Sequence, residues 1–277
     1  MSRPEHQSPP EVYYNDEEAR KYTRNSRIME VQYSLSERAL QLLCLPEDTN
    51  CLLLDLGCGS GLSATALEES GHHWIGVDIS SAMLDVAQER DLQQGDLILG
   101  DLGEGLPFRP GSFDGAVSIS ALQWLCNADR KSHNPVQRLH KLFSTLYSCL
   151  ARGARAVFQF YPEDSHQVEL ITKQSMRAGF TGGLVVDYPN SAKAKKVFLV
   201  LFTGGVNPVL PKPLTNENDA RTEVSNIERK RSHKEMRGKP PKKSRDWILA
   251  KKESRRRMGK EVREDTKYTG RKRSGRF

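Results

Sequence analysis

The sequence predicts an α/β fold with a largely parallel sheet, and three observations support this prediction. Short apolar runs alternate with segments of helical periodicity over residues 46–203. The first run, at 52–54, ends in Asp55 and leads into a glycine-rich stretch, as a buried strand followed by a tight turn would do. The last two runs, 184–187 and 197–202, are close in sequence, which favours an antiparallel pair at one end of the sheet.

Residues 1–45 precede the first expected strand, and we predict that they form a helical segment. Asn15 or Asp16 can cap a helix, and apolar residues spaced by three to four continue the helical pattern as far as Leu43. The segment also carries aromatic and cationic side chains, namely Tyr13, Tyr14, Tyr22 and Arg27. Such a segment can fold over a bound ligand as a lid, and simple packing on the sheet is the alternative.

The stretch LLLDLGCGSGLSA predicts a strand, a glycine-rich loop and a helix in direct succession. Gly57, Gly59 and Gly61 permit a tight turn and let the backbone come close to a ligand. A helix that begins just after the loop directs free N–H groups at that ligand. The spacing G-x-G-x-G lacks the last interval of the dinucleotide fingerprint, and the G-K-[ST] of a triphosphate loop is also missing.

Acidic and polar residues also follow the next three expected strands. Asp78 ends the run at 74–77, where a nucleotide-binding sheet holds ribose hydroxyls, and Ile79 follows it. Met83, in the first turn of the next helix, can pack on an adenine ring or belong to the core. Asp101 ends the run DLILGD, and Ser120 ends the following strand. Ligands bind at the carboxyl ends of parallel strands, so these residues should share one site.

The charge of this expected site indicates its ligand. A carboxylate such as Asp55 beside the loop suits a cationic group better than a pyrophosphate, because like charges repel. S-adenosylmethionine combines an amino acid end, a ribose and a sulfonium, and therefore fits. A glycine-rich turn in another doubly wound protein is the alternative.

Positive charge is concentrated at the C-terminus. Residues 228–277 hold 21 Lys and Arg against 7 Asp and Glu, although the whole chain has a formal net charge of only +7. We therefore divide the chain into the segment 1–45, a ligand-binding domain at 46–203, a Pro- and Asn-rich linker at 204–226 and a basic tail at 227–277. The tail suits a polyanion such as RNA, and its Lys/Arg runs are typical of nuclear targeting. A solvated tail is the alternative.

Several other classes of protein are disfavoured. The 5 cysteines form no C-x-x-C pair, so we expect no metal site and no disulfide framework. The N-terminal sequence lacks the apolar centre of a secretory signal, and no apolar run reaches the ~18 residues of a membrane span. We expect an intracellular protein without a membrane partner.

Five stretches together resemble one known family. They are DLGCGSG, GVDISSAMLD, SISALQWLCNA, VVDYPNSAKAKK and the terminal YTGRKR. The chain resembles the eukaryotic 18S rRNA (guanine-N7) methyltransferase family, the class I methyltransferases of bud-site selection and the Williams-Beuren region. The first two stretches are shared by many methyltransferases, whereas YPNSAKAKK and the basic C-terminus are more specific. The resemblance extends over nearly the whole chain.

The resemblance implies a Rossmann-like seven-stranded sheet with the strand order 3-2-1-4-5-7-6 and S-adenosylmethionine as the cofactor. It implies a guanine of 18S rRNA in the pre-40S particle as the substrate. It places the protein in the nucleus, in nucleoplasm and nucleolus, with the cytoplasm as a further location. Finally, it implies a heterodimer with a small zinc-binding activator protein. In that order the strand containing Leu97–Leu99 is an edge without Pro or Lys, so we expect the activator to pair with it.

The expected cofactor residues are Asp55, Gly57, Gly59, Gly61, Asp78, Ile79, Met83, Asp101, Leu102 and Ser120. Guanine N7 carries a lone pair and no proton, so we expect catalysis mainly by alignment, without a general base. The place where methyltransferases of exocyclic amines often carry [ND]-P-P-[FYW] reads SALQW here, which disfavours amine methylation. Trp124 can stack on the target base or belong to the core.

Three other functions remain compatible with the residues. The first is a small-molecule methyltransferase of the same fold, which the basic tail disfavours. The second is an RNA-binding assembly factor whose catalysis is dispensable. The third is a transfer-RNA methyltransferase that shares the activator.

Overall fold

The computed structural model describes residues 3–90, 92–130, 132–191, 194–204, 210–215, 224–226, 245–257, 262–266 and 269. It divides the chain into two compact units, Met1–Arg229 and Lys230–Phe277. Much of the expected linker, and most of the basic tail with its terminal Lys/Arg run, lie outside the described residues.

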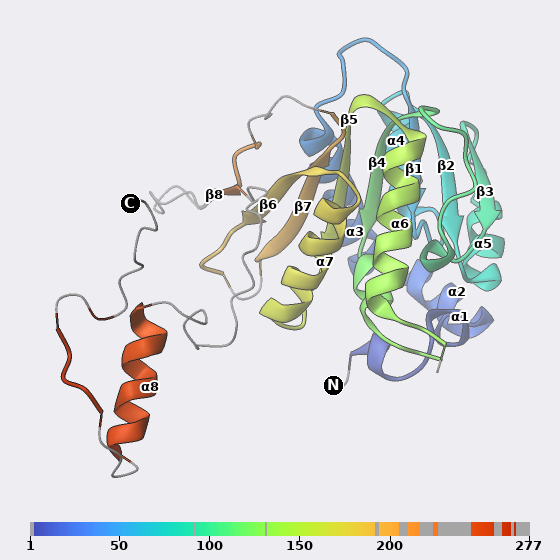
Figure 1. Ribbon diagram of the computed structural model, residues 1–277. Helices are drawn as coiled ribbons and strands as arrows, with labels where there is room; N and C mark the ends of the chain where they lie inside the picture. The colour runs from blue at the N-terminus through green and yellow to red at the C-terminus, as the bar shows by residue number, and fades with distance from the viewer. Residues whose placement is uncertain are drawn as a thin grey trace. The chain divides into compact units, whose positions relative to one another are not determined.

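The first unit is built on one mixed sheet with the order β3-β2-β1-β4-β5-β7-β6-β8 (Figure 1). The strands are β1 (Leu52–Leu56), β2 (His73–Asp78), β3 (Gly95–Leu99), β4 (Phe113–Ile119), β5 (Leu150–Phe160), β6 (Thr181–Asp187), β7 (Lys196–Phe202) and β8 (Val224–Asn226). The pairs from β3 to β5 are parallel, whereas β7, β6 and β8 join as antiparallel neighbours. The expected class I sheet is confirmed, and β8 is an additional strand.

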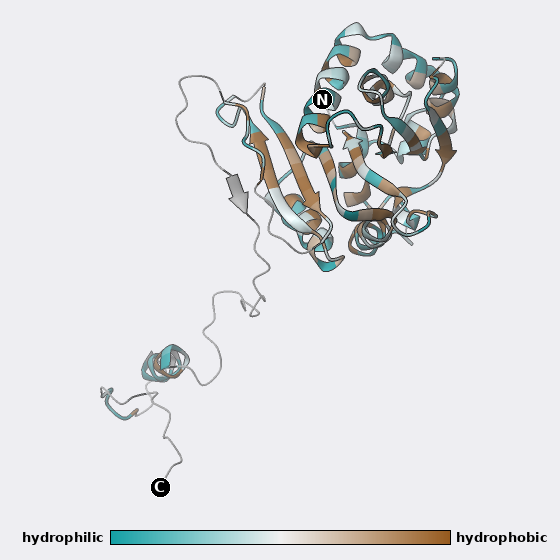
Figure 2. Ribbon diagram, turned by 90° about the horizontal axis from the view of Figure 1, so that it is seen from above, coloured by the Kyte–Doolittle hydropathy of each residue, from teal (hydrophilic) through white to brown (hydrophobic). Residues whose placement is uncertain are grey.

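Helices cover both faces of the sheet. The α-helices are α1 (Pro10–Tyr13), α2 (Asp16–Arg24), α3 (Ser26–Leu43), α4 (Leu62–Glu69), α5 (Ser81–Gln88), α6 (Pro135–Cys149), α7 (Ser165–Arg177) and α8 (Arg245–Arg257). Three 3₁₀ turns are η1 (Pro4–His6), η2 (Leu102–Glu104) and η3 (Leu122–Cys126). Successive strand residues point to opposite faces. Thus Leu54 joins the core under α6 and α7, while Leu53 joins the core under α3 and α4. Figure 2 shows the strands of the sheet as the most hydrophobic part.

The two outer parts of the sheet differ. Strand β3 has no neighbour on its outer side among the described strands, and Leu99 in it is 62% exposed. Its first residue, Gly95, pairs with Trp74, and an added Cβ there would lie 2.1 Å from the indole ring. The indole Nε1 donates to Glu68 at 3.0 Å, so the start of β3 is fixed by packing that requires glycine.

The opposite side is closed by the chain itself. Asp187, at the end of β6, accepts a hydrogen bond from Nε of Arg38 at 2.9 Å and another from the backbone N–H of Leu214 at 2.7 Å. Part of the segment predicted as a linker therefore packs on the domain, and β8 pairs with β6 further along the chain. Within the part of the chain that the structure describes, no helix is long and apolar enough to cross a membrane.

Candidate active site

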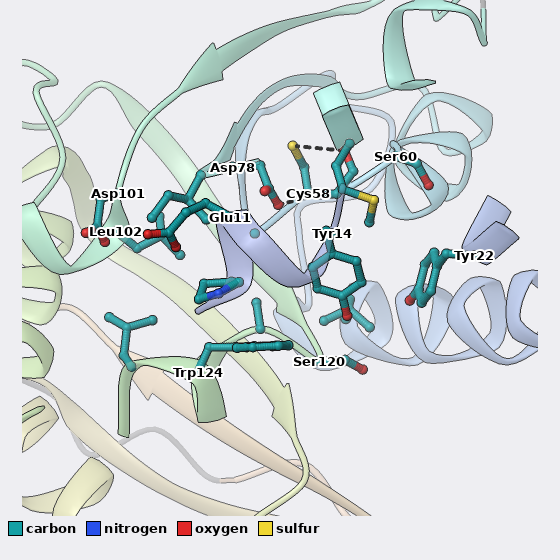
Figure 3. Close-up of a pocket in the computed structure, with 18 of the residues that line it drawn as sticks. Glu11, Tyr14, Tyr22, Cys58, Ser60, Asp78, Asp101, Leu102, Ser120 and Trp124 are labelled. Atoms are coloured by element: carbon teal, nitrogen blue, oxygen red, sulfur yellow. Dashed lines mark hydrogen bonds between the residues drawn. The ribbon is translucent and has the colours of Figure 1, made fainter. Parts of the chain in front are cut away.

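A pocket lies where the parallel strands end, between their loops and the N-terminal helices (Figure 3). Nine of the predicted site residues line it, namely Gly57, Gly59, Asp78, Ile79, Met83, Asp101, Leu102, Ser120 and Trp124. The residues 57–60, 78–83, 101–103 and 119–125 are called the pocket wall below. The residues 3–32, which contribute Glu11, Tyr14, Tyr22 and Gln32, are called the cover.

The glycine-rich loop has a conformation that only glycine adopts easily. Gly57, Gly59 and Gly61 have φ angles of +76°, +53° and +72°. A Cβ on Gly57 would lie 2.3 Å from the Cβ of Ala121, so no side chain fits there. Gly61 does not line the pocket; it precedes α4, and its added Cβ would meet Leu92 at 2.8 Å. Gly57 thus shapes the wall and Gly61 the turn into the helix.

Asp55 lies beneath the loop rather than in the wall. Its side chain is fully buried, and Oδ2 accepts a hydrogen bond from the hydroxyl of Ser63. Oδ1 has no partner among the described residues. Burial raises the pKa of Asp55 to about 7, while the Ser63 bond opposes this shift and the charge of Asp78 adds to it. Direct contact between Asp55 and the cofactor stays a prediction.

Asp78 connects the end of β2 to the glycine-rich loop. Its Oδ2 accepts from the backbone N–H of Gly59 at 2.8 Å, and its Oδ1 accepts from that of Ser80 at 2.9 Å. Burial raises the pKa of Asp78, and these backbone donors oppose the shift. Each carboxylate oxygen has a further lone pair, so the group can also accept hydrogen bonds from ribose hydroxyls in the pocket.

Ser80 joins the wall to the cover. Its Oγ accepts from the backbone N–H of Met83 at 3.2 Å, capping α5, and donates to the carbonyl oxygen of Tyr14 at 2.8 Å. Met83 is buried and packs with Tyr14 and Tyr22 of the cover. The thioether therefore lies in an apolar part of the pocket, as an adenine ring requires.

The far end of the pocket contains an arginine, Arg138, that the sequence analysis did not identify as a site residue. Asp101 caps η2, and Nη2 of Arg138 donates to its Oδ1 at 2.7 Å. Asp129 and His133 line the same end. Burial raises the pKa of Asp129, while Arg138 and His133 oppose the shift. Asn134 and Pro135 indicate the start of α6 in the sequence, but nothing there distinguishes Arg138 from an ordinary surface arginine.

Ser120 and Trp124 form the remaining side of the wall. Ser120 has a φ of +59°, and its Oγ donates to Oε1 of Gln159 at 2.8 Å. Trp124, in η3, is 8% exposed, and its ring centroid lies 5.9 Å from that of Tyr13 and 5.7 Å from that of Tyr14. This aromatic cluster joins the cover to the wall and provides a flat apolar surface beside the pocket.

The cover is held by contacts at its ends and along its surface. Arg3 donates to the carbonyl oxygens of Tyr161 and Pro162 at 3.0 and 3.1 Å. Exposed ion pairs join Arg20 to Glu89 and Glu11 to Arg130, each at 2.7 Å. Burial raises the pKa values of the Tyr14 and Tyr22 hydroxyls above their ordinary range. Both hydroxyls therefore stay protonated. The side chains of Tyr14 and Tyr22 line the pocket (Figure 3).

The residues fit S-adenosylmethionine. The backbone of Gly57 lines the pocket without a side chain, and the hydroxyl of Ser60 is buried at the pocket without a partner among the described residues. The chain matches the family model described as a methyltransferase domain over residues 54–158. The fold resembles that of a Haemonchus contortus phosphoethanolamine N-methyltransferase, with a TM-score of 0.54, 19% identity, and coverage of 74% of this chain and 61% of that chain. Fold and pocket define a class I, S-adenosylmethionine-dependent methyltransferase.

The whole-chain relatives define the family. A mouse 18S rRNA (guanine-N(7))-methyltransferase is 61% identical, over 99% of this chain and 98% of the mouse protein. The chain belongs to the family of 18S rRNA (guanine-N7)-methyltransferases. A Saccharomyces cerevisiae 18S rRNA (guanine(1575)-N(7))-methyltransferase is 46% identical over the full length of both chains. Residues 201–275 also match the model described as a methyltransferase involved in Williams-Beuren syndrome. This last match extends over the basic tail.

Proposed function

We propose that this chain transfers a methyl group from S-adenosylmethionine to N7 of a guanine in 18S rRNA, during biogenesis of the 40S ribosomal subunit. The observation that supports this most is the end-to-end similarity to relatives named for that activity. Six such relatives, from mammals, a plant, an amoeba and two yeasts, are 45–61% identical over nearly the whole chain. The similarity includes the tail, which a small-molecule methyltransferase has no use for.

In this proposal the pocket wall acts by alignment. The cofactor supplies an activated methyl group on a sulfonium, and guanine N7 supplies the lone pair that receives it. The loop at Gly57 and the carboxylates of Asp78 and Asp101 hold the cofactor, and the cluster of Tyr14 and Trp124 excludes water from the reacting atoms. The Trp124 ring is a surface on which a flipped base can stack. The reaction needs no group to remove a proton from N7.

Nucleoside mass spectrometry of ribosomal RNA tests the activity. Cells that lack the protein should lack one 7-methylguanosine in 18S rRNA, and re-expression of the wild-type chain should restore it. Gly57→Glu should not restore it, because the added side chain collides with Ala121 and displaces the loop that lines the pocket. Unchanged 7-methylguanosine in cells without the protein would contradict the proposal.

We propose that the basic tail binds RNA and that one face of α8 takes part in this binding. On one face, Nζ of Lys252 donates to Oδ1 of Asp265 at 2.8 Å, and Nη2 of Arg256 donates to its Oδ2 at 2.6 Å. On another face, one and two turns after Trp247, are Lys251 and Arg255. The Lys251 ammonium lies 4.8 Å from the centre of the Trp247 ring. Cations beside an aromatic ring suit phosphate contact combined with base stacking.

Matched charge reversals can test the two faces of α8. The double variant Lys251→Glu/Arg255→Glu should weaken binding of an 18S rRNA fragment and reduce the salt dependence of binding by about two phosphate contacts. The double variant Lys252→Glu/Arg256→Glu carries the same charge change on the face held by Asp265 and should weaken binding less. Equal effects of the two variants would mean that only net charge matters.

We propose that the activator protein pairs with the outer side of β3, around Leu97–Leu99. The support is an open edge and an apolar side chain, Leu99, that is 62% exposed. Ile98→Pro should leave the chain insoluble or unbound to the activator. Leu99→Asp should weaken co-purification, whereas Val12→Asp, at another apolar residue that is 58% exposed, should not. A soluble Ile98→Pro chain with full activator binding would refute this pairing.

We propose that the protein works in the nucleus, in nucleoplasm and nucleolus, and also reaches the cytoplasm. The support is the Lys/Arg-rich sequence of residues 228–277. Fluorescence microscopy of the tagged chain with and without these residues tests this location. Loss of nuclear signal on deletion is expected, and an unchanged distribution would contradict a targeting role for the tail.

A further inference from the structure

The connection between β6 and β7 lies at the same edge of the sheet as the pocket. This β6–β7 loop, residues 188–195, holds all but the last residue of the stretch YPNSAKAKK. In β7, which follows the loop, Val197 pairs with Phe160 at the end of β5. Strand β5 runs parallel to β4, and β4 leads directly into the pocket residue Ser120. The register of the strands therefore brings the loop and the pocket to one edge.

The β6–β7 loop is held by hydrogen bonds near both of its ends. At its start, the backbone N–H of Tyr188 donates to the carbonyl oxygen of Leu214 at 2.7 Å, next to the bond that Asp187 accepts from the N–H of Leu214. Near its end, the N–H of Lys195 donates to the carbonyl oxygen of Ser191 at 2.9 Å. A surface that is already in place binds a partner without the entropic cost of ordering it.

Two lysines at the end of this loop have no acidic partner among the described residues. Lys195 is exposed, and the ammonium of Lys196 lies 5.3 Å from the centre of the Tyr161 ring and 3.4 Å from its hydroxyl. Two acidic residues soon after Tyr161 are engaged elsewhere, since Glu163 pairs with the cover and Asp164 caps α7. The two positive charges are therefore available to an anionic partner.

Tyr161 connects these lysines to the cover. Its carbonyl oxygen accepts a hydrogen bond from Arg3 at 3.0 Å. Burial raises the pKa of Tyr22, and the nearby hydroxyl of Tyr161 adds to this shift. Because Tyr22 lines the pocket, Tyr161 is a neighbour of both the pocket and Lys196.

From this arrangement we propose that the β6–β7 loop, through Lys195 and Lys196, binds the RNA strand that flanks the target guanine. A base that is turned out into the pocket leaves its neighbours in the strand outside, so their phosphates must cross the edge of the sheet. Unpaired cations beside an aromatic ring suit such a strand. This inference rests on the function proposed above and names the surface that guides the RNA to the pocket.

Kinetics of methyl transfer to 18S rRNA purified from cells that lack the protein test the proposal. The enzyme is the full-length chain purified with its activator. Lys195→Gln/Lys196→Gln should raise the KM for RNA about 10-fold and leave kcat within about twofold, because the loop binds the strand and not the reacting atoms. The salt dependence of KM should fall by about two phosphate contacts. Affinity for S-adenosylhomocysteine should stay unchanged, since neither lysine lines the pocket, whereas a merely structural defect would lower it.

Three further variants complete the test. Lys173→Gln/Arg177→Gln makes the same charge change late in α7, which leads into the start of β6 at the opposite edge of the sheet, and should leave the KM unchanged. Lys195→Arg/Lys196→Arg keeps both charges and should keep the wild-type KM. If the double glutamine variant fails to fold, Lys195→Gln alone, at an exposed position, should raise the KM about threefold.

The outcomes separate this inference from the proposed function. If the wild type methylates the RNA and the glutamine variant of the loop keeps its KM and salt dependence, the role of the loop is refuted while the methyltransferase assignment stands. Equal effects of the loop variant and the α7 variant would also refute it. Lost activator binding with an unchanged KM would assign the lysines to an acidic protein surface and refute the RNA contact. If the wild type does not methylate 18S rRNA, the assignment and the inference are both refuted.

Discussion

The pocket wall and the cover enclose the same space with different kinds of contact. The wall is fixed by backbone geometry, with a positive φ at Gly57 and carboxylate bonds from Asp78 to the loop. The cover is fixed by aromatic packing of Tyr14 and by ion pairs whose side chains are partly exposed, such as Arg20–Glu89. Exposed ion pairs contribute little to stability, so the cover should open far more easily than the wall.

This difference assigns the two parts different tasks. A wall of fixed donors and acceptors can recognise the cofactor without rearrangement at the moment of reaction. A cover that opens allows the cofactor to enter and the spent form to leave. We propose on this basis that residues 1–45 act as a lid, and the variants below test the contrast between wall and cover.

The largest expected effect is at Gly57. Gly57→Glu should abolish cofactor binding, and Gly57→Ala should weaken it by about 100-fold, because even a methyl group meets Ala121. Gly111→Ala is the matched control, since Gly111 also has a positive φ, +69°, but nothing lies within 4 Å of its added Cβ. Calorimetry with S-adenosylhomocysteine measures both. Equal losses for the two alanine variants would show that backbone strain, rather than close approach, decides binding.

The next effect concerns pH and the carboxylate beneath the wall. The folded pKa of Asp55 is raised to about 7 from the model-peptide value of 3.8, so the folded state binds more protons than the unfolded state between these values. The free energy of unfolding is therefore highest below about pH 4, where Asp55 is protonated in both states, and it falls as the pH rises through the folded pKa. Between pH 5.5 and 7.5 the loss should be about 2 kcal/mol. Denaturant unfolding of wild type and Asp55→Asn measures it, and parallel pH profiles would contradict it.

A smaller effect is expected where the wall meets the cover. Ser80→Ala removes both the cap of α5 and the bond to the carbonyl of Tyr14, so it should cost about 1 kcal/mol and speed cofactor release about fivefold. Asn134→Ala removes the cap of α6 and leaves the Ser80–Tyr14 bond in place, so it should cost similar stability without faster release. Stopped-flow release of a fluorescent cofactor analogue distinguishes them. Identical release rates in both variants would argue against the Ser80–Tyr14 bond as a contact that keeps the cover closed.

The smallest effect is expected on the outer surface of the cover. Arg20→Ala breaks the ion pair with Glu89, whose two side chains are 49% and 55% exposed. Exposed pairs of this kind change stability little, so the melting temperature and cofactor affinity should both stay within experimental error. A clear loss of affinity in Arg20→Ala would show that this pair, rather than aromatic packing, keeps the cover closed.

Sequence reasoning predicted the strands and most of the wall, because strand periodicity and glycine spacing are local signals. The order of the strands in the sheet came from the family resemblance. It missed Arg138, which reads as a surface arginine on an amphipathic helix, because only the fold brings its guanidinium onto Gly103 and Asp101. It also did not place Asp55 beneath the loop, because a pattern shows where a strand ends but not which way its last side chain points. Strand β8 was missed for a similar reason, since three residues in a polar segment show no periodicity.

The packing of Trp74 against Gly95 has a consequence for any polypeptide that adds to the sheet beside β3. A slip of β3 by one position would bring the side chain of Asp96 or Gln94 over the indole, where only a hydrogen atom fits. The alternation of side chains along this strand is thus locked in phase, with Leu99 always on the same side. An incoming strand therefore meets an edge whose side chains always alternate between the two faces of the sheet in the same order.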